Sequence, residues 1–155
     1  MKKTPRKRLA VIGIGNILYG DDGVGVRAAW ELAKEPPAPG VDVIDGGSMG
    51  VELLDFLKAY DAVIIIDAAD MNLPAGTVKV FRPEEVKSLK RDDRLSLHSA
   101  DVLGTIELGK TLGEKLADVY IVAVQPEFVG PREGLSVSAV NALPRAIEEV
   151  RRITR

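Results

Sequence analysis

The feature that most restricts the fold of this chain is an unbroken run of apolar residues at positions 62–66. A strand that faces water on one side alternates apolar and polar residues, so an uninterrupted run predicts a strand that is buried on both faces. Such a strand belongs at the centre of a sheet covered by helices on both sides, which is a three-layer α/β/α sandwich. Asp67 follows directly at the end of the run.

Four further segments are predicted to be strands of the same sheet, at residues 9–14, 41–44, 77–81 and 119–124. Apolar residues at helical spacing predict helices over 24–35, 51–60 and 138–152 and around 102–108. Only residues 68–76 separate the third strand from the fourth, which is too short for the crossover that joins parallel strands. We therefore expect a mixed, mostly parallel five-stranded sheet in which strand four is antiparallel.

Length and charge limit the number of domains and the kinds of partner. The 155 residues show no linker or repeat, so residues 1–155 are expected to form a single domain with a basic tail at 1–8. A net charge of -2 gives no basic surface for nucleic acid, and no run approaches the roughly 20 apolar residues of a membrane helix. The expected location is cytoplasmic. The absence of cysteine excludes thiolate ligands and a cysteine nucleophile.

The most informative loop is GIGNILYGDDG at residues 13–23. Its first two glycines follow the first strand and Asp45 follows the second, as in the dinucleotide-binding fingerprint. Leu18, however, occupies the place of the third glycine, and Asp21 and Asp22 put two negative charges where a pyrophosphate would bind. A dinucleotide-binding module is therefore the less favoured alternative, and no nucleotide is expected as a cofactor.

Three side chains are candidates for chemistry at the carboxyl edge of the sheet, where α/β proteins bind ligands. Asp22 lies in the glycine-rich loop, Asp67 ends the third strand, and His98, the only histidine, is expected in a loop after strand four. Each also has a purely structural interpretation, as a helix cap, an Asx turn and a backbone hydrogen bond, respectively. Together, two carboxylates and one imidazole form a set suited to nickel, zinc or another borderline divalent metal.

With these residues in place, the sequence resembles a known family, the hydrogenase maturation endopeptidases. The matching segments occur in family order as GIGNILYGDDGVGV, VIDGGSMGVELLDFL, IIIDAAD with PAGTV, LSLHSADVL, and VQPE with GLS. They cover nearly the whole chain, from about residue 9 to residue 146. The resemblance implies the three-layer sandwich and a peptidase that removes the C-terminal tail of a nickel-iron hydrogenase large-subunit precursor, cutting just after a basic residue once nickel has been inserted.

The resemblance also assigns roles to individual residues. It implies that Asp22, Asp67 and His98 bind a metal at the cleavage cleft and act in catalysis. The metal is expected to be the nickel of the substrate, used as a recognition signal. The remaining matched positions are expected to line the same cleft and bind substrate, namely Gly15, Asn16, Asp21, Asp45, Gly46 and Gly47.

Two routes to hydrolysis stay open at the level of sequence. In the favoured route, a metal-bound water attacks the peptide bond and a free carboxylate acts as base. In the other, the three ligands only dock the precursor, and an acid such as Asp21 or Asp45 activates water. A non-enzymatic alternative is a nickel-dependent checkpoint that holds the precursor without cleaving it, but the presence of all three ligand residues argues against a binding-only protein.

Overall fold

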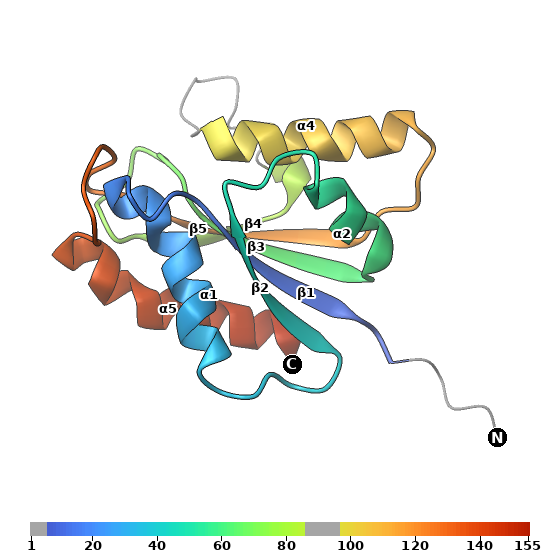
Figure 1. Ribbon diagram of the computed structural model, residues 1–155, viewed down its shortest axis with the longest axis horizontal. Coiled ribbons are helices and arrows are strands. Elements are labelled where there is room, and N and C mark those ends of the chain that lie inside the picture. Colours follow the sequence, from blue (N-terminus) through green and yellow to red (C-terminus); the bar gives the residue numbers. More distant parts are fainter. Residues whose placement is uncertain (1–5, 86–96) are drawn as a thin grey trace.

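A computed structural model describes residues 6–85 and 97–155 of the chain. Its five strands are β1 (Leu9–Ile14), β2 (Val41–Gly47), β3 (Ala62–Ala68), β4 (Val78–Phe81) and β5 (Asp118–Val124). The main helices are α1 (Val24–Ala33), α2 (Leu53–Ala59), α4 (Leu97–Thr111) and α5 (Val137–Thr154), and a 3₁₀ turn, η1 (Gly20–Gly23), precedes α1. Figure 1 shows the sheet between two layers of helices.

The sheet has the strand order β2-β1-β3-β5-β4. Strands β1, β2, β3 and β5 run parallel, and β4 pairs antiparallel with β5. This confirms the predicted mixed sheet with an antiparallel fourth strand. The short connection after β3 has room only for a return in the opposite direction, because a parallel strand would need a crossover of a dozen or more residues.

Two cores, one on each side of the sheet, explain the unbroken apolar run of β3. Val63 and Ile65 pack in the core beneath α2 and α4, whereas Ile64 and Ile66 pack in the core beneath α1 and α5. Successive side chains of a strand point to opposite faces, so both sets must be apolar. The longest described helix, α5, has 18 residues, and none of the helices in residues 6–85 and 97–155 is long and apolar enough to cross a membrane.

Gly25 lets α1 approach the sheet very closely. A Cβ atom added there would lie 2.1 Å from the carbonyl oxygen of Ile66 on β3 and 2.6 Å from that of Ile14 on β1. A Cβ atom added to Gly13 would in turn lie 2.1 Å from the carbonyl oxygen of Gly25. The first glycine of the fingerprint-like loop therefore serves the packing of helix on sheet.

Three of the boundaries that differ from the prediction change the place of a candidate residue. Strand β2 continues to Gly47, so the segment from Asp45 is strand rather than turn, and β3 continues to Ala68, so Asp67 lies within the strand. Helix α4 begins at Leu97, so His98 lies in its first turn and not in a loop. The prediction of this helix used the apolar residues Val102, Ile106 and Leu108, the first of which follows Leu97 by five residues.

Candidate active site

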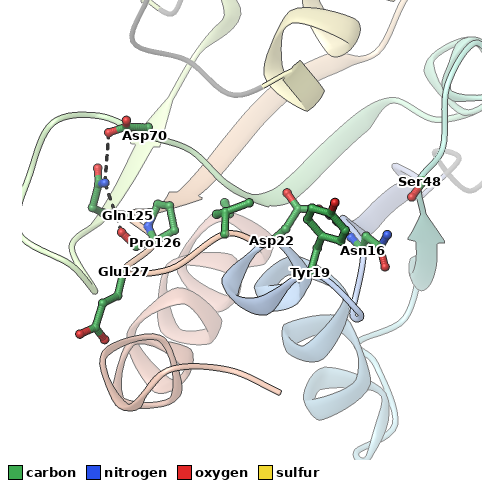
Figure 2. A pocket seen from close by; sticks show the side chains of 10 residues that line it. Asn16, Tyr19, Asp22, Ser48, Asp70, Gln125, Pro126 and Glu127 are labelled. Carbon is green, nitrogen blue, oxygen red and sulfur yellow. Dashed lines mark hydrogen bonds between the residues drawn. The ribbon is translucent and has the colours of Figure 1, made fainter. Parts of the chain in front are cut away.

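A pocket of about 730 Å³ lies at the carboxyl ends of the parallel strands (Figure 2). Its walls come from segments at or after the ends of β1, β2, β3 and β5. Strands β2 and β3 lie on opposite sides of β1, so this edge is a point where the strand order reverses, which is where open α/β sheets bind ligands. The lining residues are Asn16, Tyr19, Asp22, Ser48, Ala68, Asp70, Gln125, Pro126, Glu127 and Val129.

Of the predicted catalytic residues whose side chains the structure describes, Asp22 and not Asp67 lines this pocket. The side chain of Asp22 belongs to η1 and is only 8% exposed. The backbone N–H of Asn16 donates a hydrogen bond of 2.9 Å to its Oδ2 atom, and the side chain of Asn16 in turn accepts a hydrogen bond of 2.9 Å from the backbone N–H of Leu18. Gly15 makes this loop possible, with a φ of 137° and no space for a Cβ beside the carbonyl oxygen of Asp22. The loop thus holds one carboxylate in a fixed orientation at the pocket wall.

Asp67 is buried at the end of the central strand, with 1% of its surface exposed. It pairs with Ala123 of β5 and directly precedes Ala68, which lines the pocket. Ile66 and Ala68 belong to the core beneath α1 and α5, so Asp67 faces the opposite layer, which contains α4. Figure 1 shows that α4 begins on the side of the sheet where β3 and β5 end. The backbone of His98, in the first turn of α4, is therefore at the same edge as Asp22 and Asp67.

Whether these three residues form one metal site stays a prediction. The side chain of His98 lies outside the described part of the structure. Among the side chains that are described, no three of the types His, Cys, Asp and Glu lie close enough together to hold a metal ion. Two carboxylates near one edge, with a single imidazole on the helix that begins there, provide the donor types expected for nickel or zinc.

Asp21, the neighbour of Asp22, joins the two walls of the pocket. Its carboxylate is 1% exposed and accepts four hydrogen bonds from a segment more than 100 residues away. The backbone N–H groups of Glu127, Phe128 and Ser136 donate over 2.8, 3.2 and 2.7 Å, and the Ser136 hydroxyl donates over 2.7 Å. The turn that carries Asp22 is therefore fixed to the segment that carries Glu127.

These hydrogen bonds also set the protonation state of Asp21. Burial by itself would raise the pKa of the Asp21 carboxyl, but the hydrogen bonds from Ser136, Glu127 and Phe128 outweigh burial and hold the pKa below its ordinary value. A carboxylate with a lowered pKa and four donors is a weak base. Asp21 is also absent from the residues that line the pocket. Its predicted contact with substrate stays a prediction, while its geometry gives it a structural role.

The predicted DGG segment lies beside the pocket without lining it. The side chain of Asp45 accepts hydrogen bonds from Trp30 Nε1 over 2.8 Å and from the backbone N–H of Gly47 over 3.0 Å. Gly47 accepts a hydrogen bond of 2.8 Å from the backbone N–H of Gly15, and a Cβ atom added at Gly46 would lie 2.8 Å from Ile12. Its chain neighbour Ser48 does line the pocket. Substrate binding by this segment stays a prediction.

Asp70 and Gln125 are two of the eight lining residues that were not among the predicted site residues. The buried Gln125 accepts a hydrogen bond of 2.7 Å from the backbone N–H of Met71 and donates one of 3.2 Å to Asp70 Oδ1 (Figure 2). Hydrogen bonds from the backbone N–H of Asn72 and from Gln125 lower the pKa of Asp70. Gln125 is the only glutamine of the chain and directly follows a buried strand, which is the signal that points to it.

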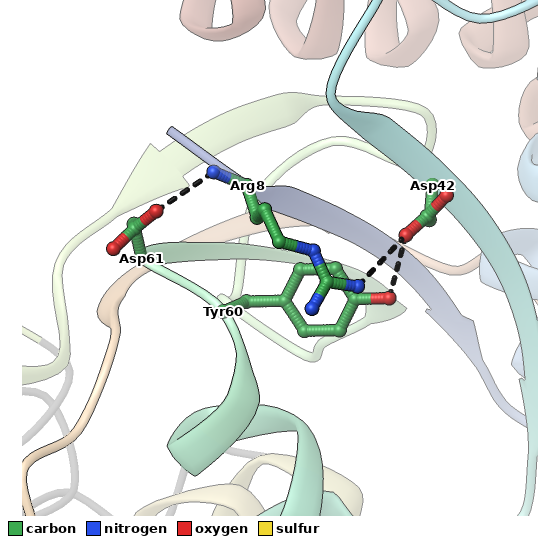
Figure 3. A network of polar contacts seen from close by, with 4 residues as sticks. All are labelled: Arg8, Asp42, Tyr60 and Asp61. Atoms are coloured by element: carbon green, nitrogen blue, oxygen red, sulfur yellow. Dashed lines mark hydrogen bonds and ion pairs between the residues drawn. The ribbon is translucent and has the colours of Figure 1, made fainter. Parts of the chain in front are cut away.

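A second polar network lies at the opposite edge of the sheet, where the parallel strands begin (Figure 3). The Arg8 guanidinium lies 4.6 Å from the centre of the Tyr60 ring and 3.6 Å from Asp42, and the backbone N–H of Arg8 donates to Asp61 over 2.7 Å. The hydrogen bond that Tyr60 donates to Asp42, together with burial, raises the pKa of Tyr60. This network attaches the start of β1 to its neighbours and is remote from the pocket.

Comparison with known proteins places this chain in a family. The sequence model of the hydrogenase maturation protease family matches residues 26–153. The hydrogenase 2 maturation protease of Escherichia coli strain K12 is 36% identical over 146 residues, which cover 92% of this chain and 88% of that protein. The hydrogenase expression/formation protein HupD of Rhizobium leguminosarum bv. viciae is 32% identical over 161 residues, with coverage of 97% and 76%.

Solved structures agree with the sequence comparison. The hydrogenase maturating endopeptidase HybD from E. coli superimposes with a TM-score of 0.81 at 32% identity, covering 92% of this chain and 89% of that one. Several HupD, HoxM and HupM relatives are longer proteins, of which this chain spans 54% to 62%. Because the family model covers most of the chain and relatives match nearly all of it, the chain belongs to the hydrogenase maturation proteases, a family of peptidases.

Proposed function

We propose that this protein is the endopeptidase that removes the C-terminal tail of a nickel-iron hydrogenase large-subunit precursor after nickel has been inserted. Membership of the family supports the class of reaction and the class of partner. The observation that carries the proposal is the pocket at the carboxyl edge of the sheet, in whose wall Asp22 is held by the backbone of Asn16. The protein is proposed to act in the cytoplasm, without a nucleotide.

The geometry favours one of the two routes to hydrolysis. Asp21 is a poor candidate for the base because four hydrogen bonds occupy its carboxylate and lower its pKa. Asp45 accepts hydrogen bonds from Trp30 and Gly47 and does not line the pocket. The proposed catalytic groups are therefore Asp22 and Asp67 together with His98. Asp22 would orient the reacting groups at the pocket wall, and a metal held by these residues would lower the pKa of a water molecule and so supply the nucleophile.

Nickel is proposed to belong to the substrate and to signal that the precursor is ready. Two carboxylates and one imidazole, without a thiolate or a second histidine, make a modest site for permanent storage of a metal. The same set suits transient contact with a nickel ion that the precursor already holds. Such contact would orient the tail against the pocket and convert a diffusive encounter into a positioned one.

The charge of the pocket supports a basic residue near the bond that is cut. Asp22, Asp70 and Glu127 contribute carboxylates to the wall, and the lining residues that the structure describes include no lysine or arginine. The lowered pKa of Asp70 keeps its carboxyl ionised at neutral pH. A cationic side chain of the substrate would be attracted into such a pocket.

The proposal is tested by mixing metal-free enzyme with nickel-loaded and with nickel-free precursor and measuring release of the tail. We expect release from the nickel-loaded form alone. Equal cleavage of the nickel-free form would refute the role of nickel as a signal. Dependence on metal added to the enzyme would indicate an intrinsic metallopeptidase, and tight binding of the loaded precursor without loss of its tail would indicate a checkpoint that does not cleave.

A further inference from the structure

Four large apolar side chains are exposed together at the mouth of the pocket. Leu18 and Tyr19 follow β1, and Phe128 and Val129 follow β5; Leu18 is 60% exposed and the other three are between 43% and 51% exposed. Tyr19 and Val129 also line the pocket. We refer to these four residues as the apolar rim.

Backbone hydrogen bonds bring the two halves of the apolar rim together. The N–H of Asp21 donates to the carbonyl oxygen of Phe128 over 2.9 Å, and the N–H of Arg132 donates to that of Leu18 over 3.1 Å. A Cβ atom added to Gly20 would lie 3.0 Å from the ring of Phe128, so this ring lies close against the turn. The two halves of the apolar rim therefore lie side by side, although their segments are more than 100 residues apart in the sequence.

The apolar rim is held in place before any partner binds. The buried carboxylate of Asp21 accepts hydrogen bonds from the backbone of Glu127 and Phe128, immediately beside the second half of the rim. A single exposed leucine needs no explanation, but a cluster of large apolar side chains on a fixed surface is typical of an interaction site. Because the backbone of the rim is already ordered, the binding of a partner to it costs little conformational entropy.

The position of the apolar rim identifies its partner. Tyr19 and Val129 belong both to the rim and to the wall that contains Asp22, so a peptide whose scissile bond lies near Asp22 is within reach of the rim. The pocket is acidic and the rim is apolar. The segment that fits both surfaces is an extended chain with a basic side chain and with apolar side chains beside it.

We infer that the apolar rim binds apolar side chains of the precursor's C-terminal segment as this segment enters the pocket. The inference rests on the proposed function and deepens it, because it makes the residues flanking the cut part of the recognition. Binding at the rim contributes to affinity for the precursor, whereas Asp22 and its partners act on the bond. Loss of rim side chains should therefore raise KM and leave kcat nearly unchanged.

The test compares Leu18→Ser and Phe128→Ser with a matched control, Leu112→Ser. Leu112 follows the last residue of α4, at the end of that helix away from the pocket, and is 59% exposed against 60% for Leu18. The substrate is the nickel-loaded large-subunit precursor. Each rim variant should raise KM for tail release roughly tenfold, the size expected when one apolar side chain is partly buried on binding, with kcat within about twofold. The control should match the wild type.

A binding measurement on the same uncleaved precursor separates this inference from the proposed function. If the wild type binds the precursor more tightly than the rim variants do but releases no tail, the rim stands and the peptidase proposal fails. If the wild type releases the tail and both rim variants bind and cleave like Leu112→Ser, the peptidase proposal stands and the rim inference is overturned. Denaturant unfolding of each variant shows whether a loss comes from misfolding.

Discussion

Replacing Asp21 by asparagine should destabilise the protein strongly, although the two side chains have nearly the same shape. Asparagine keeps the outline of the side chain but exchanges one carboxylate oxygen for an amide group. At the Oδ2 position that amide would face three donors, from Glu127, Phe128 and the Ser136 hydroxyl. At the Oδ1 position it would face only the backbone N–H of Ser136. The second orientation costs less, so it sets the size of the effect.

The magnitude follows from the bonds that this orientation loses or weakens. One hydrogen bond to a charged acceptor disappears, worth about 1.5–3 kcal/mol, and the three that remain change from charged to neutral acceptors. We therefore expect Asp21→Asn to lower the free energy of unfolding by about 3 kcal/mol. A matched control is Asp118→Asn, because Asp118 is exposed and meets Arg82 across 3.8 Å. Such a surface pair contributes about 0.5 kcal/mol.

Urea unfolding at two pH values supplies the assay, since the pKa of Asp21 is lower in the folded state than its ordinary value of 3.8. A lowered folded pKa means that the unfolded chain binds the proton more tightly. The wild type should therefore keep the full Asp21 contribution above pH 3.8 and lose it as the pH falls towards the folded pKa. Asparagine does not titrate, so the difference in free energy of unfolding between the wild type and Asp21→Asn should become smaller as the pH falls. If Asp21→Asn lowers the free energy of unfolding by less than about 1 kcal/mol at pH 7, or if its difference from the wild type grows in acid, these hydrogen bonds do not stabilise the fold as described.

The remaining predictions concern packing, the distant network and nickel. Gly25→Ala should lower the free energy of unfolding by at least about 2 kcal/mol, because the new methyl group would lie 2.1 Å from a backbone oxygen. The control is Gly104→Ala on α4, where an added Cβ atom meets nothing within 4 Å. This control should leave the stability unchanged or raise it, as thermal unfolding can measure. A neutral Gly25→Ala would mean that α1 can move away from the sheet. Arg8→Ala should cost at most about 1 kcal/mol and leave tail release unchanged, and reduced release would link the two edges. Metal-free enzyme should cleave only nickel-loaded precursor in a gel assay, and cleavage of both forms would remove nickel from the recognition step.

The parts of the fold that could be predicted are those fixed by local patterns. The apolar run of β3 identifies a central strand because both of its faces must be buried. The short connection before β4 determines that strand's direction, because a crossover cannot fit. The start of α4 at Leu97 could not be found in the same way, since the apolar residues that predicted this helix are Val102, Ile106 and Leu108. His98 was therefore expected in a loop.

The edge of the sheet at which the candidate site lies could be predicted, but the structural role of Asp21 could not. The resemblance separates the adjacent acids, with Asp22 in catalysis and Asp21 in substrate binding, but nothing in the local sequence indicates that Asp21 is bound by a distant segment. In a 3₁₀ turn, successive side chains point about 120° apart, so one reaches the segment that carries Phe128 and Ser136 while the other lines the pocket. The donors that bind Asp21 come from 106 to 115 residues away. No local pattern reveals a contact at that separation.

The most direct test of the proposed peptidase activity is the intact mass of a nickel-loaded large-subunit precursor after incubation with wild-type protein or with Asp22→Asn. Asparagine can still accept the hydrogen bond from Asn16, so this variant should fold with a stability within about 1 kcal/mol of the wild type. We expect loss of the C-terminal tail with the wild type and an unchanged precursor with Asp22→Asn. An intact precursor after incubation with the wild type, or release of the tail by the variant at the wild-type rate, would contradict the proposed role of Asp22 and of this pocket.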